Sequence, residues 1–205
     1  VAFYVSGQLL TEDYYAANKF AKGFVGTANI DTNSRLCMAS SVAGHKRAFD
    51  SDTVPGRYED FEQADLVVLV GSNLAWCHPV LFQRLEAARQ ARPEMKVVVI
   101  DPRRTETCAL ADLHLALKPG SDVALFNALL VELKRRGVVA RGFVERHTGG
   151  LEAALGAARA SDIALCDLPD ADVATFFDWF AATEKTVTLY SQGVNQSSAG
   201  VDKVN

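Results

Sequence analysis

The chain has 205 residues, of which 49% are hydrophobic, and a formal net charge of −4. This length suffices for one sizeable hydrophobic core or two small lobes. Nucleic-acid-binding proteins typically carry a basic stripe. This chain is acidic and has none, which argues against nucleic acid as a partner. No apolar run is long enough to span a membrane, and we expect no membrane partner.

The four cysteines lie at positions 37, 77, 108 and 166, and no two of them form a CxxC pair. The sequence therefore predicts neither a zinc site nor a complete iron–sulfur site. Reduced thiols of this kind are typical of cytoplasmic proteins. The first residues, Val1–Val5, resemble the middle of a strand, with no initiator Met and no signal peptide. We expect an internal piece of a longer enzyme, cytoplasmic unless a preceding export signal makes it periplasmic.

The chain opens with a strand, a turn and a helix. Ala2–Val5 predicts the strand and Ser6-Gly7-Gln8 the turn. The helix should be capped by Thr11 and stop at Gly23. Open α/β sheets bind ligands at the carboxyl ends of their strands, where this turn lies. Taken alone, Gln8 is equally an ordinary exposed turn residue.

The stretch Asn33–Ser41 places Cys37 among small and polar residues, just ahead of a helical pattern over Ala39–Phe49. Backbone N–H groups and the helix dipole stabilise a thiolate at a helix N-terminus. A thiolate is a soft ligand that suits a transition metal. The alternative is that Cys37 is a small, buried apolar residue, as most lone cysteines are.

Two continuous apolar runs, Leu66–Val70 and Val97–Ile100, predict strands that are buried on both faces. They end in Gly71-Ser72-Asn73 and Asp101-Pro102-Arg103, and Pro79 begins a helix between them. An acid after the second strand of a βαβ unit commonly binds ribose hydroxyls. The glycines do not follow the G-x-G-x-x-G pattern, so a nucleotide is indicated more strongly than NAD. The alternative is two tight turns without a ligand.

A third strand, Leu113–Leu117, precedes Gly120-Ser121-Asp122 and a helix that runs from Val123 to Arg136. Ser121 or Asp122 could simply cap this helix. The last strand, Thr186–Tyr190, again ends in glycine and polar side chains. Between them we expect helices whose aromatic cluster serves core or domain-interface packing; it comprises Phe176, Phe177, Trp179 and Phe180.

The alternation of strands and helices predicts an α/β fold of parallel-sheet, Rossmann-like lobes with helices on both faces. We expect residues 1–35 and 186–205 to form a first, incomplete α/β lobe. Residues 36–185 would form an inserted Rossmann-like lobe that binds a nucleotide.

The stretch 7–49, GQLLTEDYYAANKFAKGFVGTANIDTNSRLCMASSVAGHKRAF, closely resembles nitrate reductases of the assimilatory and periplasmic kind, within the molybdopterin oxidoreductase family. The resemblance continues in patches to the last residue and implies the middle domains of the formate dehydrogenase/DMSO reductase fold. The Cys of the N-x-R-x-C-M-A-S pattern, here Cys37, binds molybdenum in that group. Gln192 stands where periplasmic enzymes place Met, which together with Ile100-Asp101-Pro102 favours the assimilatory branch.

The resemblance also implies a cofactor and its ligands. The cofactor is molybdenum-bis(molybdopterin guanine dinucleotide), with Cys37 as catalytic residue and metal ligand. The acid of the P-G-[ST]-D pattern, Asp122, would accept hydrogen bonds from the guanine base. The residues implied to lie against the cofactor are Gln8, Asn33, Gly71, Ser72, Asn73, Asp101, Pro102, Arg103, Gly120, Ser121, Asp122, Gln192, Gly193 and Gln196.

The implied reaction is the two-electron reduction of nitrate to nitrite by oxygen-atom transfer to molybdenum. The electrons would come from an unidentified donor through a 4Fe–4S cluster in the parent chain, outside these residues. We expect the isolated chain to be inactive and without molybdenum.

The sequence leaves three alternatives to a nitrate reductase open. A formate dehydrogenase of the same family typically has His directly after its metal-binding residue, whereas Met38 follows Cys37 here. A NAD-binding dehydrogenase domain would use Asp101 to bind ribose. A non-catalytic scaffold with the family fold would keep Cys37 buried.

Overall fold

The computed structural model describes all 205 residues, which divide into two compact units. Unit 1 comprises Val1–Thr53 and Ala199–Asn205, and unit 2 comprises Val54–Ser198. Both contain parallel strands and helices, as the sequence predicts. No helix has the length and apolar character needed to cross a bilayer.

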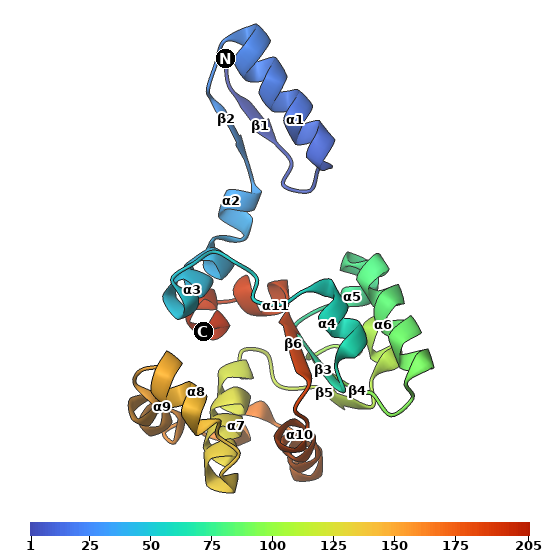
Figure 1. Ribbon diagram of the computed structural model, residues 1–205, viewed down its shortest axis with the longest axis vertical. Helices are drawn as coiled ribbons and strands as arrows, with labels where there is room; N and C mark the ends of the chain where they lie inside the picture. The colour runs from blue at the N-terminus through green and yellow to red at the C-terminus, as the bar shows by residue number, and fades with distance from the viewer. The chain divides into compact units, whose positions relative to one another are not determined.

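Unit 1 consists of β1 (Phe3–Val5), α1 (Thr11–Lys19), the π-helix η1 (Phe20–Val25), β2 (Ile30–Thr32), α2 (Ser34–Cys37), α3 (Ala39–Phe49) and α12 (Gly200–Val204). Strands β1 and β2 pair in parallel, so both end at the same edge. Helix α1 runs beside this two-stranded sheet (Figure 1), and the Phe20 ring meets Phe3 edge-on at 5.8 Å. Helix α12 joins α3 through an ion pair between Arg47 and Asp202, 2.6 Å long.

Two local predictions in unit 1 are wrong. The first helix does not stop at Gly23 but continues as η1 to Gly26, whose φ of 75° lies in the left-handed region that glycine adopts without steric cost. Its N-cap is Leu10 rather than Thr11, and no side chain caps it. Strand β2 is only three residues long and has no sequence signal of its own.

Unit 2 consists of α4 (Tyr58–Gln63), β3 (Leu66–Val70), α5 (Leu74–Cys77), α6 (Pro79–Ala91), β4 (Lys96–Ile100), η2 (Glu106–Leu110), β5 (Leu113–Leu115), α7 (Asp122–Arg136), α8 (Arg141–His147), α9 (Leu151–Ala158), η3 (Ile163–Cys166), α10 (Asp170–Ala182), β6 (Thr186–Tyr190) and α11 (Gln192–Asn195). Its sheet is parallel throughout and has the order β5-β4-β3-β6. All five residues of β3 are buried, as its continuous apolar run predicts.

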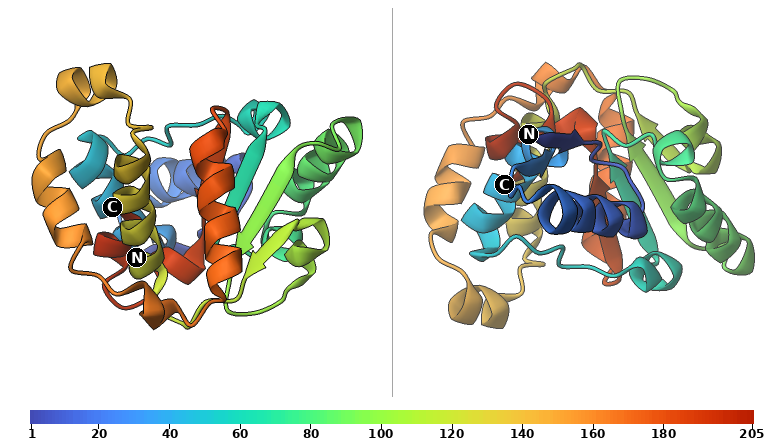
Figure 2. Two further views of the ribbon diagram at one scale, coloured as in Figure 1. Left: turned by 90° about the horizontal axis from the view of Figure 1, so that it is seen from below. Right: turned by 90° about the horizontal axis from the view of Figure 1, so that it is seen from above.

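Helices cover both faces of this sheet. On one face, Val67 and Val97 belong to a core cluster that also contains Phe61 of α4 and Leu85 of α6. Helix α10 lies on the opposite side of the sheet from α6 (Figure 2) and packs on α7, where the Phe126 and Phe176 rings are 6.4 Å apart. The buried Phe176 and Phe177 confirm the core packing expected of the aromatic cluster.

The expected lobe boundaries differ from the observed units. We expected Thr186–Tyr190 beside the first strand, but β6 pairs in parallel with β3, so this assignment is wrong. The physical reason is that Val187 and Leu189 of β6 pack against the apolar core of unit 2. Residues 36–53 belong to unit 1 and not to the inserted lobe. Unit 2 lies in the sequence between the two parts of unit 1, so one unit is inserted into the other as expected.

Candidate cofactor site

The predicted site residues of unit 2 follow its four parallel strands. Because parallel strands end at one edge of a sheet, the turns after β3, β4, β5 and β6 share that edge. The chain leaves β3 toward β4 and β5 and returns on the other side of β3 as β6. The ends of β3 and β6 therefore mark the topological switch point, the place where open α/β sheets bind ligands.

Two glycines meet at this switch point. The Gly193 N–H donates to the Gly71 carbonyl at 3.0 Å. A Cβ on Gly193 would lie 2.6 Å from the Gly71 Cα, and Gly71 has a φ of +54°. Only glycine at both positions allows this approach of the two backbones.

Hydroxyl groups tie the same two loops together. The Ser191 Oγ donates to the Ser72 Oγ at 2.9 Å, and the Ser191 N–H donates to the Val70 carbonyl at 3.1 Å. Ser72 is buried. Together with the glycine contact, these bonds hold the loop after β6 against the loop after β3.

Asn73 is held by a residue that sequence reasoning missed. The buried Thr107 hydroxyl donates to the Asn73 Oδ1 and accepts from the Ala75 N–H, each at 3.1 Å. Thr107 lies 34 residues along the chain from Asn73, so no short motif could indicate the contact.

Asp101 is buried, and its carboxylate accepts a hydrogen bond from the Arg103 N–H at 2.8 Å. This local bond closes the turn after β4 and leaves Pro102 and Arg103 exposed. The His114 ring lies 2.9 Å from the Asp101 carbonyl oxygen and joins this turn to β5. Asp101 is thus fixed at the sheet edge by its neighbours.

The turn before α7 places Ser121 at the N-cap, but its hydroxyl donates to the Lys118 carbonyl at 2.6 Å and does not cap the helix. Gly120 adopts a φ of +89°, and Asp122 is the first residue of α7. After β6, Gln192 and Gln196 are exposed at the two ends of α11. The sheet therefore gathers eleven of the predicted residues at one edge, namely Gly71, Ser72, Asn73, Asp101, Pro102, Arg103, Gly120, Ser121, Asp122, Gln192 and Gly193, with Gln196 one helical turn further on.

The other three predicted residues lie together in unit 1. Strands β1 and β2 end side by side, and the Gly7 N–H donates to the Asn33 Oδ1 across them. The Asn33 carbonyl accepts from the Cys37 N–H at 2.8 Å, one helical turn on. Asn33 therefore connects the turn that carries Gln8 to the turn that carries Cys37.

A second residue missed by sequence reasoning, Tyr14 of α1, binds the turn that carries Gln8. Its hydroxyl donates to the Ser6 carbonyl at 2.7 Å and accepts from the Leu9 N–H at 3.2 Å. Tyr14 belongs to no motif of the sequence, and only the fold brings its hydroxyl to the turn.

Cys37 is exposed in unit 1, at the end of α2 and two residues before α3. Its position near a helix N-terminus agrees with the sequence. Cys77 is also exposed, whereas Cys108 and Cys166 are buried, and burial raises the pKa of both of these thiols. No group of three or more His, Cys, Asp or Glu side chains lies close enough to hold a metal ion.

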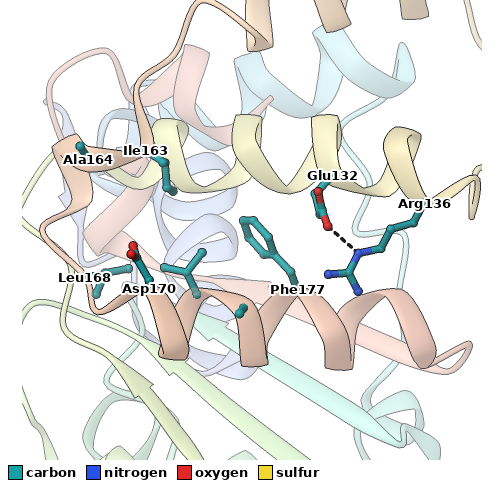
Figure 3. A pocket seen from close by; sticks show the side chains of 9 residues that line it. Glu132, Arg136, Ile163, Ala164, Leu168, Asp170 and Phe177 are labelled. Carbon is teal, nitrogen blue, oxygen red and sulfur yellow. Dashed lines mark hydrogen bonds and ion pairs between the residues drawn. The ribbon is translucent and has the colours of Figure 1, made fainter.

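A pocket of about 350 Å³ opens elsewhere in unit 2, between α7, η3 and α10 (Figure 3). Phe177 and Ile163 line it, and the ion pair of Glu132 and Arg136, 2.7 Å long, closes one end. The predicted site residues do not line this pocket, so we do not assign the cofactor to it.

The sequence model of one family, described as molybdopterin oxidoreductase, matches residues 1–205, the whole chain. The chain belongs to the molybdopterin oxidoreductase family. Membership implies a molybdenum cofactor bound through molybdopterin.

Curated proteins named nitrate reductase resemble the chain along its whole length. It is 56% identical to a nitrate reductase of Klebsiella oxytoca, with all of this chain and 24% of that protein covered. It is 51% identical to a nitrate reductase of Shewanella frigidimarina, with all of this chain and 22% of that protein covered. The chain thus spans about a quarter of the length of these relatives.

Among solved structures, acetylene hydratase from Pelobacter acetylenicus has a similar fold. The TM-score is 0.73 at 20% sequence identity, over 98% of this chain and 28% of that one. This likeness supports the α/β fold class of the chain and nothing about its reaction.

Each unit, taken by itself, has residues whose chemistry fits part of a molybdopterin cofactor. Cys37 offers an exposed thiol, the kind of soft ligand that a molybdenum ion accepts. The sheet edge of unit 2 has a glycine turn after β3 and the buried Asp101 after β4, as nucleotide-binding sheets have a glycine turn after one strand and an acid after the next.

Proposed function

We propose that the chain is part of a molybdenum-dependent nitrate reductase that reduces nitrate to nitrite, with Cys37 as the protein ligand to molybdenum. The observation that carries the proposal is the whole-chain similarity to nitrate reductases, at 56% and 51% identity. The exposed Cys37 thiol, joined through Asn33 to the turn of Gln8, supports the metal site.

The cofactor in this proposal is molybdenum-bis(molybdopterin guanine dinucleotide). The turns at the carboxyl edge of unit 2 would bind its nucleotide. Asp122 has the carboxylate that can accept two parallel N–H bonds from guanine. Asp101 offers carboxylate oxygens for ribose hydroxyls, Asn73 and Ser72 offer donors for phosphate oxygens, and no side chain stands at Gly71 or Gly193.

When bound, the cofactor supplies two-electron oxygen-atom transfer chemistry, for which no amino acid side chain is suited. The residues of this chain hold and orient it. In unit 1, Gln8 and Asn33 would lie beside the pterin while Cys37 ligates the metal. No side chain acts as a nucleophile, so the protein contributes ligation, orientation and exclusion of water.

The parent protein would bind a 4Fe–4S cluster outside these residues and receive electrons from a donor protein or domain. This division of labour predicts that the isolated 205-residue chain contains no stoichiometric molybdenum and reduces no nitrate. Metal analysis of the purified chain tests this, and one molybdenum per chain would contradict it.

The decisive experiment uses the full-length protein. We would measure nitrite formation from nitrate with reduced viologen, and the molybdenum content, for the wild type and for Cys37→Ser and Cys37→Ala. The proposal predicts an active wild type and an activity loss of at least roughly a hundredfold in both variants. A molybdenum-loaded wild type that oxidises formate but does not reduce nitrate would contradict the substrate assignment alone. A wild type without molybdenum would contradict the metal assignment.

A further inference from the structure

We propose that Tyr14 is a positioning residue that, together with Asn33, fixes the turn Ser6–Leu9 against the Cys37 turn. This inference deepens the proposed function and rests on it, because it assumes that Gln8 in this turn lies beside the pterin. The evidence lies wholly within unit 1.

The Tyr14 hydroxyl bridges the two ends of the turn. It donates to the carbonyl of Ser6, the first residue, and accepts from the N–H of Leu9, the fourth. In a compact four-residue turn these two backbone groups commonly bond to each other. With the phenol between them, the shape of the turn depends on a side chain from α1.

Asn33 holds the same turn from the side of β2. Its Oδ1 accepts from the Gly7 N–H, and a Cβ on Gly7 would lie 2.8 Å from that oxygen. The close approach brings the turn directly onto the start of α2. The Asn33 carbonyl also accepts from the Cys37 N–H at 2.8 Å.

These contacts form a continuous chain from Tyr14 through the turn and Asn33 to Cys37. The remaining support of the turn is weak, because the Gln8 N–H donates to the Ser6 Oγ at 3.3 Å, a bond within the turn itself. The Gln8 side chain is exposed. Beyond the pairing of β1 with β2, Tyr14 and Asn33 are thus the residues that fix the turn of Gln8 relative to the Cys37 turn.

The test compares Tyr14→Phe with Tyr15→Phe in the full-length protein. Tyr14→Phe removes only the bridging oxygen, whereas the neighbouring Tyr15 is 69% exposed and serves as a control for a phenol lost from the same helix. Three quantities are measured in each variant: hydrogen exchange at the Leu9 amide, molybdenum per polypeptide, and kcat and KM for nitrate.

For Tyr14→Phe we expect exchange at Leu9 to rise by roughly threefold to tenfold, as for one lost hydrogen bond. Molybdenum content or kcat should fall while KM for nitrate stays unchanged, because the cofactor and not the substrate is misplaced. Tyr15→Phe should match the wild type in all three. If exchange at Leu9 rises while molybdenum content and kcat stay at the wild-type level, Tyr14 only shapes the turn and the proposal is wrong. Unchanged exchange would also overturn it.

A second pair of variants tests the other contact, and keeps the role of Asn33 in the proposal testable if Tyr14→Phe does not fold. Asn33→Ala removes the acceptor for the Gly7 N–H, and Asn33→Asp keeps an oxygen there. We expect exchange at Gly7 to rise and molybdenum content to fall in Asn33→Ala, and exchange at Gly7 to return toward the wild-type rate in Asn33→Asp. Equal molybdenum content in Asn33→Ala and the wild type would overturn the proposal.

The same data separate this inference from the proposed function. A wild type that holds molybdenum but does not reduce nitrate contradicts the substrate, while the molybdenum content of the variants still decides the role of Tyr14. A wild type that holds no molybdenum overturns both.

Discussion

Gly193 and Gly71 are in backbone contact at the switch point of unit 2, with the Gly193 N–H bonded to the Gly71 carbonyl at 3.0 Å. The contact joins two loops that are more than a hundred residues apart in sequence. Gly193→Ala would place a Cβ 2.6 Å from the Gly71 Cα and 2.7 Å from its carbonyl oxygen. These are backbone atoms, so they cannot rotate away.

We expect Gly193→Ala to destabilise the edge formed by β3 and β6 by about 1–3 kcal/mol, the usual cost of overpacking. Hydrogen exchange of the β3 and β6 amides in the full-length protein measures this local free energy. Molybdenum content should fall in parallel, since the two loops would separate. The matched control is Gly156→Ala, within α9, where an added Cβ meets no atom within 4 Å. Because alanine favours a helix, Gly156→Ala should stabilise by about 0.5–1 kcal/mol.

Arg89 of α6 and Asp112, the residue directly before β5, form a bidentate ion pair. The Arg89 Nη2 donates to the Asp112 Oδ1 at 2.6 Å, and the Val97 N–H donates to the Asp112 Oδ2 at 2.8 Å. Burial alone would raise the pKa of Asp112, but the bonds from Arg89 and Val97 outweigh it and hold this pKa below the usual value of 3.8. The stabilisation is thus fully present above that usual value and is lost as the pH falls through the lower folded pKa.

Asp112→Asn should therefore lower the free energy of unfolding of unit 2 by about 1.5–3 kcal/mol near neutral pH. The difference from the wild type should shrink as the pH falls below about 4, because the wild-type carboxylate then gains a proton. Urea titrations across this pH range measure it. Glu152→Gln is the control, since its ion pair with Lys134 is exposed and should be worth about 0–1 kcal/mol at any of these pH values. A pH-independent loss in Asp112→Asn would contradict the assignment.

Thr107 should matter through its hydroxyl and not through its bulk. Thr107→Val keeps the shape but leaves the Ala75 N–H and the Asn73 Oδ1 without this partner. We expect a loss of about 1–3 kcal/mol in stability and a lower cofactor content. Thr107→Ser retains the hydroxyl and should keep the cofactor content of the wild type. Equal behaviour of the Val and Ser variants would show that Thr107 serves packing only.

Cys108 and Cys166 should resist alkylation, because burial hides them and raises the pKa of each thiol. The thiolate is the reactive form, so a raised pKa lowers its fraction near neutral pH. We expect iodoacetamide to label the exposed Cys77 at least roughly tenfold faster in the native protein. Peptide mapping by mass spectrometry measures the three rates. Labelling in urea is the control, where the three cysteines should react alike.

The sequence alone determined the elements with strong local patterns. The apolar runs at Leu66–Val70 and Val97–Ile100 form β3 and β4. Helix α6 begins at Pro79 and helix α7 ends before Gly137, as expected. Strands β3 and β4 are buried on both faces because a run without polar alternation has no face to expose to water. The stretch around Cys37 indicated the family through its unusual order of small and polar residues.

Only the tertiary structure decided which elements meet. The place of β6 beside β3 depends on core packing, which no local pattern of Thr186–Tyr190 encodes. Tyr14 and Thr107 bind backbone and side-chain atoms that their own segments do not specify. Hydrogen bonds between distant residues form only once the sheet has set their distance. The sequence could therefore name the loops of the candidate site, while the residues that hold those loops in place emerged from the fold.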